Sequence, residues 1–189
     1  MDKFFIIFAR LISIFVPNRR LRRRIRKDIW QFPFRCKVRK QAQKVGKNLY
    51  VSSPSSVNRR TIIGDNCGFS GITVNGKGNL TIGNHFRSGA ELLFLTQNHN
   101  YKDALTLPYD EEYIYKDTII GDCVWCGARV TILPGTRIGE GVIVQAGSVV
   151  HGEIPPCAII GGNPAVIIKY RDKEHYYKLK KENKFHYGG

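Results

Sequence analysis

Apolar side chains return every six residues through a glycine-rich stretch of the second half of the chain. One set of small or apolar residues is spaced six apart, at Ile120, Cys126, Ile132, Ile138, Val144 and Val150. A second set follows each of these by four positions, at Val124, Val130, Thr136, Val142, Ser148 and Ile154. A helix repeats its apolar positions every three or four residues and a strand every two, so a period of six predicts a short strand and a corner, repeated.

Glycines and earlier copies of the unit complete this pattern. The glycines fall near the expected corners, where a positive φ is often needed and glycine adopts it without steric cost, at Gly121, Gly127, Gly135 and Gly139. Related units begin with "IIGDNC" at residue 62 and "TIGNHF" at residue 81, although the phase breaks between them. The pattern therefore predicts a coiled, all-β domain over residues 51–168.

The repeat is interrupted by "FLTQNHNYKDALTLPYDEEYIYKDT", residues 94–118. This segment is too long for a corner and is rich in polar and aromatic side chains. Long excursions from a rigid scaffold are common places for functional sites. We therefore expect the chemistry to involve this loop, which contains His99 and the acidic residues Asp103, Asp110, Glu111 and Glu112. Two interpretations of these acidic side chains remain open. They could bind sugar hydroxyls or orient His99, or they could simply form the solvated surface of the loop.

The N-terminal segment, residues 1–50, has a different composition and is predicted to be a helical arm. Residues 4–16, "FFIIFARLISIFV", are apolar apart from Arg10 and Ser13, and "PNRRLRRRIRK" follows with seven bases. Thirteen helical residues span about 20 Å, less than the roughly 30 Å of a bilayer's hydrocarbon layer. A signal peptide has its charge before the apolar run, which is the reverse order. Two interpretations remain, an interfacial helix with its bases on anionic headgroups and a helix packed on the coil or in an oligomer.

Charge is distributed unevenly over the 189 residues, whose formal net charge is +15. Residues 1–47 contain 15 Lys or Arg and two acids, giving +13, and the tail from Lys169 to the end contributes +4. The repeat domain between them is close to neutral, at −2. This asymmetry argues against a protein that coats nucleic acid and directs attention to the basic N-terminal arm. Residues 169–189 are expected to form a basic C-terminal tail with a short helix.

The five cysteines, an odd number without a secretory signal, favour a reducing compartment. "CVWC", residues 123–126, has the spacing of a zinc or redox pair. Cys126, however, occupies an inward position of the hexapeptide, and no second pair accompanies it. Buried structural thiols are therefore the favoured interpretation, and no metal is expected.

The segments "IGDCVWCGA", "ILPGTRIGEGVIVQAGSVV" and "IPPCAIIGGNPAVIIK" resemble the hexapeptide-repeat acyltransferases, in particular the maltose and galactoside O-acetyltransferases. The likeness extends from about residue 61 to 169 and leaves residues 1–50 outside it. It implies a left-handed parallel β-helix that assembles as a homotrimer. It also implies acetyl-CoA as co-substrate and transfer of an acetyl group to a hydroxyl.

The resemblance also implies the catalytic residues. His99 in "TQNHNY" matches the catalytic base, and a neutral imidazole is suited to take the proton of a sugar hydroxyl as it attacks. An asparagine that stabilises the oxyanion in galactoside acetyltransferases falls here on Ser70, whose hydroxyl has a shorter reach, and backbone amides are an alternative source of donors.

The donor groove implied by the family includes small residues that let pantetheine approach the backbone, and Ala128 and Ala146 match two of them. Where the family has a threonine and a lysine, this chain has His151 and Gly152, so one expected phosphate or pantetheine contact is missing. Lys169, with Arg171 beside it, is expected near the nucleotide phosphates. The expected cofactor-binding residues are Trp125, Gly127, Ala128, Ala146, Gly147, His151, Gly152 and Lys169.

These observations favour an acetyl-CoA-dependent O-acetyltransferase that modifies a sugar of a bacterial surface polysaccharide or lipid-linked glycan precursor. It is expected to be cytoplasmic and peripheral at the inner face of the cell membrane. An N-acetyltransferase of an amino-sugar nucleotide is the nearest chemical alternative, and a non-enzymatic membrane or nucleic-acid adaptor is an alternative of another class. A carbonic anhydrase on the same scaffold requires three histidines that bind one zinc ion, and the histidines of this sequence do not have the spacing for such a site.

Overall fold

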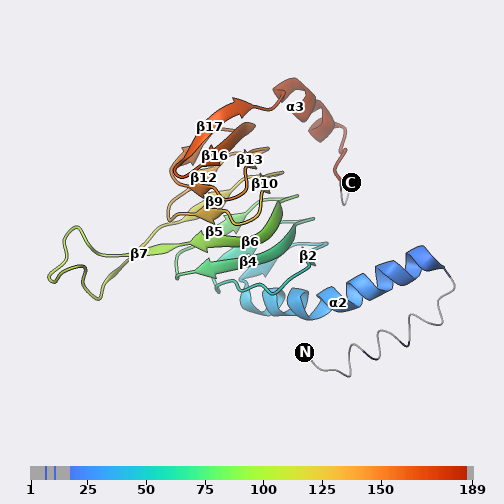
Figure 1. Ribbon diagram of the computed structural model, residues 1–189, viewed down its shortest axis with the longest axis horizontal. Helices are drawn as coiled ribbons and strands as arrows, with labels where there is room; N and C mark the ends of the chain where they lie inside the picture. The colour runs from blue at the N-terminus through green and yellow to red at the C-terminus, as the bar shows by residue number, and fades with distance from the viewer. Residues whose placement is uncertain (1–6, 8–10, 12–17, 187–189) are drawn as a thin grey trace.

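The computed structural model describes residues 7, 11 and 18–186, which wind into a stack of parallel coils between two helices (Figure 1). Each coil has three sides, and strands on the same side of successive coils pair in parallel. The first side consists of β1 (Lys44–Val45), β3 (Thr61–Ile63), β5 (Leu80–Ile82), β9 (Thr118–Ile120), β12 (Arg137–Ile138) and β15 (Glu153–Ile154). The predicted parallel β-helix is confirmed.

The second and third sides share two long strands, β4 (Gly68–Asn75) and β6 (Arg87–Leu95), which bend from one side to the next. The second side is completed by β2 (Tyr50–Val51), β10 (Trp125–Cys126), β13 (Ile143–Val144) and β16 (Ala158–Gly162), and the third by β11 (Thr131–Ile132) and β14 (Val149–Val150). We call the turn between the first and second sides the first corner. The second corner joins the second and third sides, and the third corner leads to the next coil.

The core is a narrow column of inward side chains, as the six-residue period predicts. Of the twelve residues in the two predicted sets, eleven are buried, and only Ile154 is partly exposed. On the second side, Phe69, Ser88 and Cys126 lie in register on successive coils, and on the third side Phe94 lies in register with Ile132. Burial of these side chains is the main stabilising term of the fold.

A ladder of side-chain hydrogen bonds joins the coils at the first corner. Asp65 accepts a bond from the backbone N–H of Lys47 at 2.7 Å, and Asn84 accepts one from the N–H of Asp65 at 2.8 Å. Asp122 accepts the next from the N–H of Asn84 at 2.7 Å. Each bond satisfies a corner amide that no strand pairs, so these polar residues fix the vertical spacing of the coils.

The corner conformation differs from the expectation based on glycine. Positive φ angles at the first corner belong to Asn66, His85 and Cys123, each at 57°. Of the four glycines expected to supply it, only Gly135 has a positive φ, of 84°. The other three are needed for space, because a Cβ would lie within 2.7 Å of the next coil's backbone nitrogen at Gly121, Gly127 and Gly139. The expectation of positive φ was therefore wrong at these three positions.

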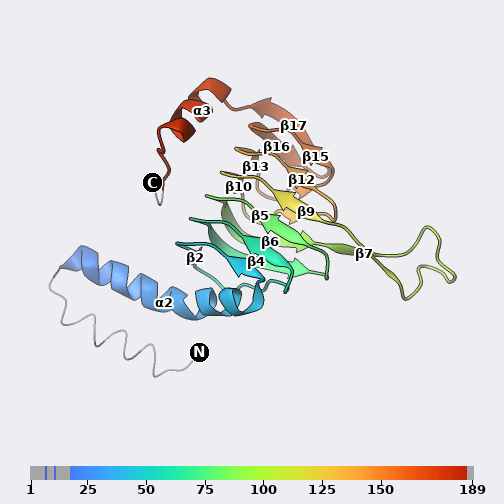
Figure 2. The same cartoon turned by 180° about the vertical axis from the view of Figure 1, so that it is seen from behind.

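The interruption forms a hairpin that projects from the third corner, on the side opposite α3 (Figures 1 and 2). Its stem consists of β7 (Gln97–His99) and β8 (Tyr113–Tyr115), which pair antiparallel. The tip between them contains large exposed side chains, with Leu105 and Leu107 at 94% and 96% exposure. The stack itself begins at β1, which lies within the residues assigned above to the N-terminal arm.

A helix lies at each end of the stack. α2 (Arg19–Gln41) packs under the first coil, and its Asn18 cap accepts bonds from the N–H groups of Arg20 and Leu21. At the other end, β17 (Ala165–Tyr170) pairs antiparallel with β16 and leads into α3 (Lys173–Lys181). The predicted apolar helix of residues 4–16 lies outside the described residues, apart from residues 7 and 11. In the described part of the chain, no helix combines the length and apolar character needed to cross a bilayer.

Candidate active site

His99 lies at the end of β7, where the hairpin leaves the stack. Its imidazole stacks on the ring of Tyr109, with centroids 3.8 Å apart, and contacts the tilted ring of Tyr113 at 4.5 Å. The Nδ1 atom is buried and has no hydrogen-bond partner within residues 18–186. Aromatic contacts, and not a hydrogen bond at Nδ1, therefore hold this ring in place.

One acidic residue of the hairpin, Asp110, organises the loop. Asp110 accepts bonds from the side chain of Asn100 at 2.9 Å and from the N–H of Glu112 at 3.0 Å. Its backbone N–H also donates to the carbonyl oxygen of Asn100 at 3.3 Å. These bonds close the loop and use the carboxylate of Asp110 internally. Its role is therefore to shape the hairpin that carries His99.

Ser70 lies on β4 near the second corner, where it pairs with Ala90. Its Oγ accepts a hydrogen bond from the Oγ of Ser52 at 2.8 Å. From Ser70 to Asn75 the strand crosses the whole third side, about 15 Å of extended chain. Asn75 pairs with Leu95, which precedes His99 by four residues. Within one chain, Ser70 and His99 therefore lie at opposite ends of the third side.

Six of the predicted acetyl-CoA-binding residues lie at two corners of the coil. Gly127, Ala128, Ala146 and Gly147 stack at the second corner, where the N–H of Gly147 donates to the carbonyl of Ala128 at 2.9 Å. A Cβ on Gly147 would meet nothing within 4 Å, so this corner is open to solvent. His151 and Gly152 follow β14 at the third corner, and both are exposed. The predicted acetyl-CoA-binding residues at these corners thus border the third side on both edges.

Trp125 and Lys169 lie on the outer face of the second side. Trp125 pairs with Ile143, which pairs with Ile159, and Ile159 pairs with Lys169. The Trp125 side chain is 55% exposed. An apolar strip flanked by an aromatic ring and an ammonium group therefore extends from the middle of the stack to its end.

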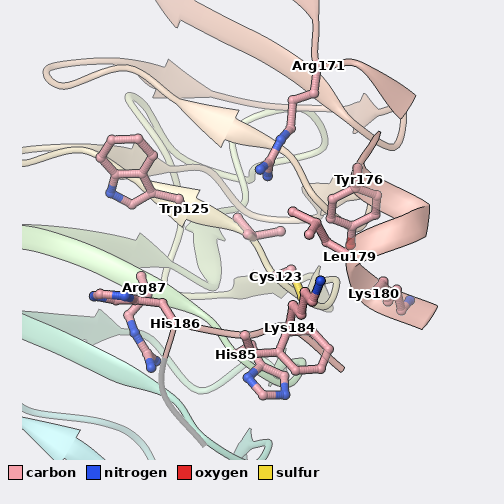
Figure 3. A pocket seen from close by; sticks show the side chains of 12 residues that line it. His85, Arg87, Cys123, Trp125, Arg171, Tyr176, Leu179, Lys180, Lys184 and His186 are labelled. Carbon is pink, nitrogen blue, oxygen red and sulfur yellow. The ribbon is translucent and has the colours of Figure 1, made fainter. Parts of the chain in front are cut away.

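A cavity of about 210 Å³ lies between α3 and the first corner and was not predicted from the sequence (Figure 3). Tyr176 packs over Gly141, where a Cβ would come within 2.8 Å of the ring. Arg171 donates to the Gly141 carbonyl at 3.1 Å, and Lys180 forms an ion pair with Glu140. These charges attach α3 to the coil, so Arg171 has a structural role here.

The cysteines show no pairing in the structure, and Cys126 is fully buried as predicted. Burial raises the pKa of the Cys126 thiol to about 12 and that of Cys67 to about 11. Such thiols are almost entirely protonated near neutral pH and are poor nucleophiles. Within the described residues, no three His, Cys, Asp or Glu side chains gather as a metal site.

Comparison with known proteins bears on this arrangement. Residues 117–152 match the family model of the bacterial transferase hexapeptide, described as six repeats. The Bacillus subtilis (strain 168) protein named "Putative acetyltransferase YvoF" is 49% identical over 70 residues, covering 37% of this chain and 40% of that protein. The Escherichia coli (strain K12) protein named "Putative lipopolysaccharide biosynthesis O-acetyl transferase WbbJ" is 38% identical over 102 residues, 50% of this chain and 52% of the relative.

Among solved structures, a hexapeptide-repeat containing acetyltransferase from Vibrio cholerae superposes with a TM-score of 0.63 at 24% identity. The match covers 87% of this chain and 88% of that one, and the same protein has also been solved with acetyl coenzyme A. The predicted similarity to hexapeptide-repeat acyltransferases is confirmed by these matches. The matches to the two curated relatives span only 40% and 52% of their lengths.

Proposed function

We propose that this protein is an acetyl-CoA-dependent O-acetyltransferase that acts on a sugar hydroxyl of a surface polysaccharide or a lipid-linked glycan precursor. The observation that carries the proposal is the position of His99. It lies at the base of the only hairpin between coils in the described chain, held by two tyrosine rings. The names of the Escherichia coli and Vibrio cholerae relatives support acetyl transfer from acetyl-CoA.

His99 would act as the general base. A neutral imidazole accepts the proton of the acceptor hydroxyl as its oxygen attacks the thioester carbon, and the proton then passes to the departing thiolate. The developing oxyanion needs donors, for which Ser70 and exposed backbone amides of the second corner are the candidates. In this proposal acetyl-CoA lies along the third side, between the small residues at the second corner and the residues His151 and Gly152 at the third corner.

A homotrimer would bring these elements together. The candidate base lies at the third corner, while Ser70, Ala128 and Ala146 lie at the second corner of the same chain. In a ring with three-fold symmetry, each interface can join the second corner of one copy to the hairpin of its neighbour. The division of the candidate residues between two corners therefore supports a site built from two copies.

The decisive experiment compares wild-type protein with His99→Ala on acetyl-CoA and a panel of sugar acceptors. We expect turnover to fall by at least two orders of magnitude, since a general base typically contributes a factor of about 10² to 10⁴. Acetyl-CoA affinity, measured by calorimetry, and the oligomeric state should persist. His175→Ala, an exposed histidine on α3, is the matched control and should keep full activity.

Near wild-type turnover in His99→Ala would remove His99 from the mechanism. Acetylation of a hydroxylated compound that is not a sugar, with no sugar acceptor modified, would contradict the proposed acceptor class while leaving the transfer chemistry intact.

A further inference from the structure

A second cavity, of about 410 Å³, lies between α2 and the second side of the first coils. Its walls combine cationic, hydroxyl and apolar groups from the helix and from three successive coils. The lining residues are Arg24, Arg35, Asn48, Leu49, Tyr50, Gly68, Phe69, Ser70, Arg87 and Ser88. Ser70, the candidate oxyanion donor, is one of them, so the cavity adjoins the candidate site.

Two of its arginines come from the face of α2 that packs on the coil. Residues spaced by three, four or seven share one face of a helix, and Arg24, Gln31, Arg35 and Val38 follow this spacing. Gln31 and Val38 are fully buried, with exposures of 1% and 0%. Arg24 and Arg35 therefore lie on the face of α2 that borders the cavity, where Arg35 is half-buried and Arg24, nearer the start of the helix, is exposed.

The third arginine comes from the opposite wall. Arg87 lies in register with Gly68, and a Cβ on Gly68 would come within 3.3 Å of its Nη1 atom. The Nη1 group also donates to the carbonyl oxygens of Phe86, at 2.9 Å, and of Asn66. These contacts fix the Arg87 side chain on the second side, where it lines both this cavity and the cavity beside α3. The absence of a side chain at Gly68 leaves room for it.

The charge of the cavity is strongly positive. None of its ten lining residues is acidic. Arg35 donates to the backbone carbonyl of Asp28 at 3.3 Å and lies 3.7 Å from its carboxylate, but Asp28 is outside the lining and 54% of its side chain is exposed. Lys27 adds a further cation, 4.6 Å from the centre of the Tyr50 ring. Guanidinium groups that line two walls of one cavity are suited to a planar or tetrahedral oxyanion.

We infer that this cavity binds the phosphate or diphosphate group of a phosphorylated ligand. The identity of the ligand rests on the proposed function. If the protein acetylates a phosphorylated sugar, a cavity beside Ser70 would hold the phosphate end of that acceptor while its sugar reaches the transfer site. The apolar floor of Leu49 and Phe69 accommodates the group attached to the phosphate. A nucleoside diphosphate sugar and a polyisoprenyl diphosphate sugar share this chemistry.

The test uses the full-length protein and calorimetric titration with inorganic diphosphate, UDP and farnesyl diphosphate. Arg24→Gln and Arg35→Gln should each weaken diphosphate binding roughly tenfold, since each removes a charge-assisted contact. Arg137→Gln, an exposed arginine of β12 on the first side, is the matched control and should bind as wild type. Circular dichroism checks that each variant is folded. Tighter binding of farnesyl diphosphate than of UDP identifies a lipid source, and the reverse order identifies a nucleotide.

Equal diphosphate affinity in the wild type, Arg24→Gln, Arg35→Gln and Arg137→Gln would overturn the inference. The same variants are assayed for acetylation of a small neutral sugar, which does not need the cavity. Loss of diphosphate binding with this activity retained supports the inference and leaves the proposed function standing. Diphosphate binding that depends on Arg24 and Arg35, without acetylation of any acceptor, supports the site and refutes the proposed function.

Discussion

At the scale of single residues, the coil depends on polar atoms as much as on its apolar column. Thr118 and Thr136 are both buried in equivalent positions at the first side. The hydroxyl of Thr136 donates to the carbonyl of Leu133 at 2.6 Å, whereas that of Thr118 has no hydrogen-bond partner within the described chain. The same residue type therefore stabilises one coil and carries an uncompensated desolvation cost in another.

Replacement of these two threonines should change stability in opposite directions. Thr118→Val removes a buried hydroxyl without a partner and should raise the free energy of unfolding by about 1 kcal/mol. Thr136→Val removes the shorter of two bonds to the Leu133 carbonyl, which keeps only the N–H of residue 136 at 3.3 Å, and should lower the free energy of unfolding by a similar amount. Urea denaturation at one protein concentration measures both, and destabilisation by Thr118→Val would contradict the assignment of its hydroxyl.

Stacking on His99 gives a second prediction at this scale. Tyr109 is 45% exposed and contributes little to the core, but its ring lies 3.8 Å from the imidazole. Tyr109→Ala should lower kcat about tenfold by releasing the base from its position, with the KM for acetyl-CoA unchanged. Tyr109→Phe keeps the stacked ring and should retain activity. Equal kcat values for these two variants would show that stacking does not position the base.

At the scale of elements, the hexapeptide phase predicts the sides of the coil, because each inward position must be small or apolar wherever it occurs. The hairpin stem could not be predicted, since it depends on pairing between residues at least fourteen positions apart, and the stacking of Tyr109 on His99 depends on the folded hairpin. The short C-terminal helix was predicted, but its packing was not, because Tyr176 of α3 contacts Gly141 of a distant coil. A local motif was enough to propose His99 as the base, but its separation from Ser70 required the three-dimensional path of the chain.

The N-terminal arm gives a prediction at the scale of elements. α2 begins with a run of arginines and has no acid in its first turn, which is unfavourable for the helix dipole unless an anionic surface lies nearby. Replacing three exposed arginines outside the cavity, Arg20, Arg23 and Arg26, by Gln should weaken binding to anionic liposomes about a hundredfold, at about 1 kcal/mol for each base. Binding is measured by co-sedimentation.

Deletion of residues 1–18 separates the apolar contribution from the charges. The shortened protein should bind anionic liposomes more weakly and in a more salt-sensitive way, because its remaining attraction is electrostatic. Activity on a small soluble acceptor should persist. Equal binding of the full chain to neutral and anionic liposomes would favour the alternative, a helix that packs in the oligomer.

At the scale of the whole molecule, the two-corner arrangement predicts complementation between inactive chains. His99→Ala keeps the second corner, and Ala146→Trp, which fills the open surface there, keeps the base. If the site lies between copies in a trimer, co-expression of the two variants in equal amounts should restore roughly a quarter of wild-type activity. On average, one interface in four then joins the intact second corner of one variant to the intact hairpin of the other. Light scattering establishes the oligomeric state. Absence of any recovery in a mixed trimer would locate the whole site in one chain.

The third corner has a consequence for how this scaffold can diversify. Ladder partners at the first corner are 18 residues apart from Lys47 to Asp65, but 38 apart from Asn84 to Asp122, because the hairpin intervenes. The bond lengths are the same, so the extra residues leave the stacking undisturbed. The hairpin therefore can change independently of the stack, and new acceptor preferences can arise from substitutions in its exposed tip, such as at Leu105 and Leu107, while His99 and the coils keep their positions.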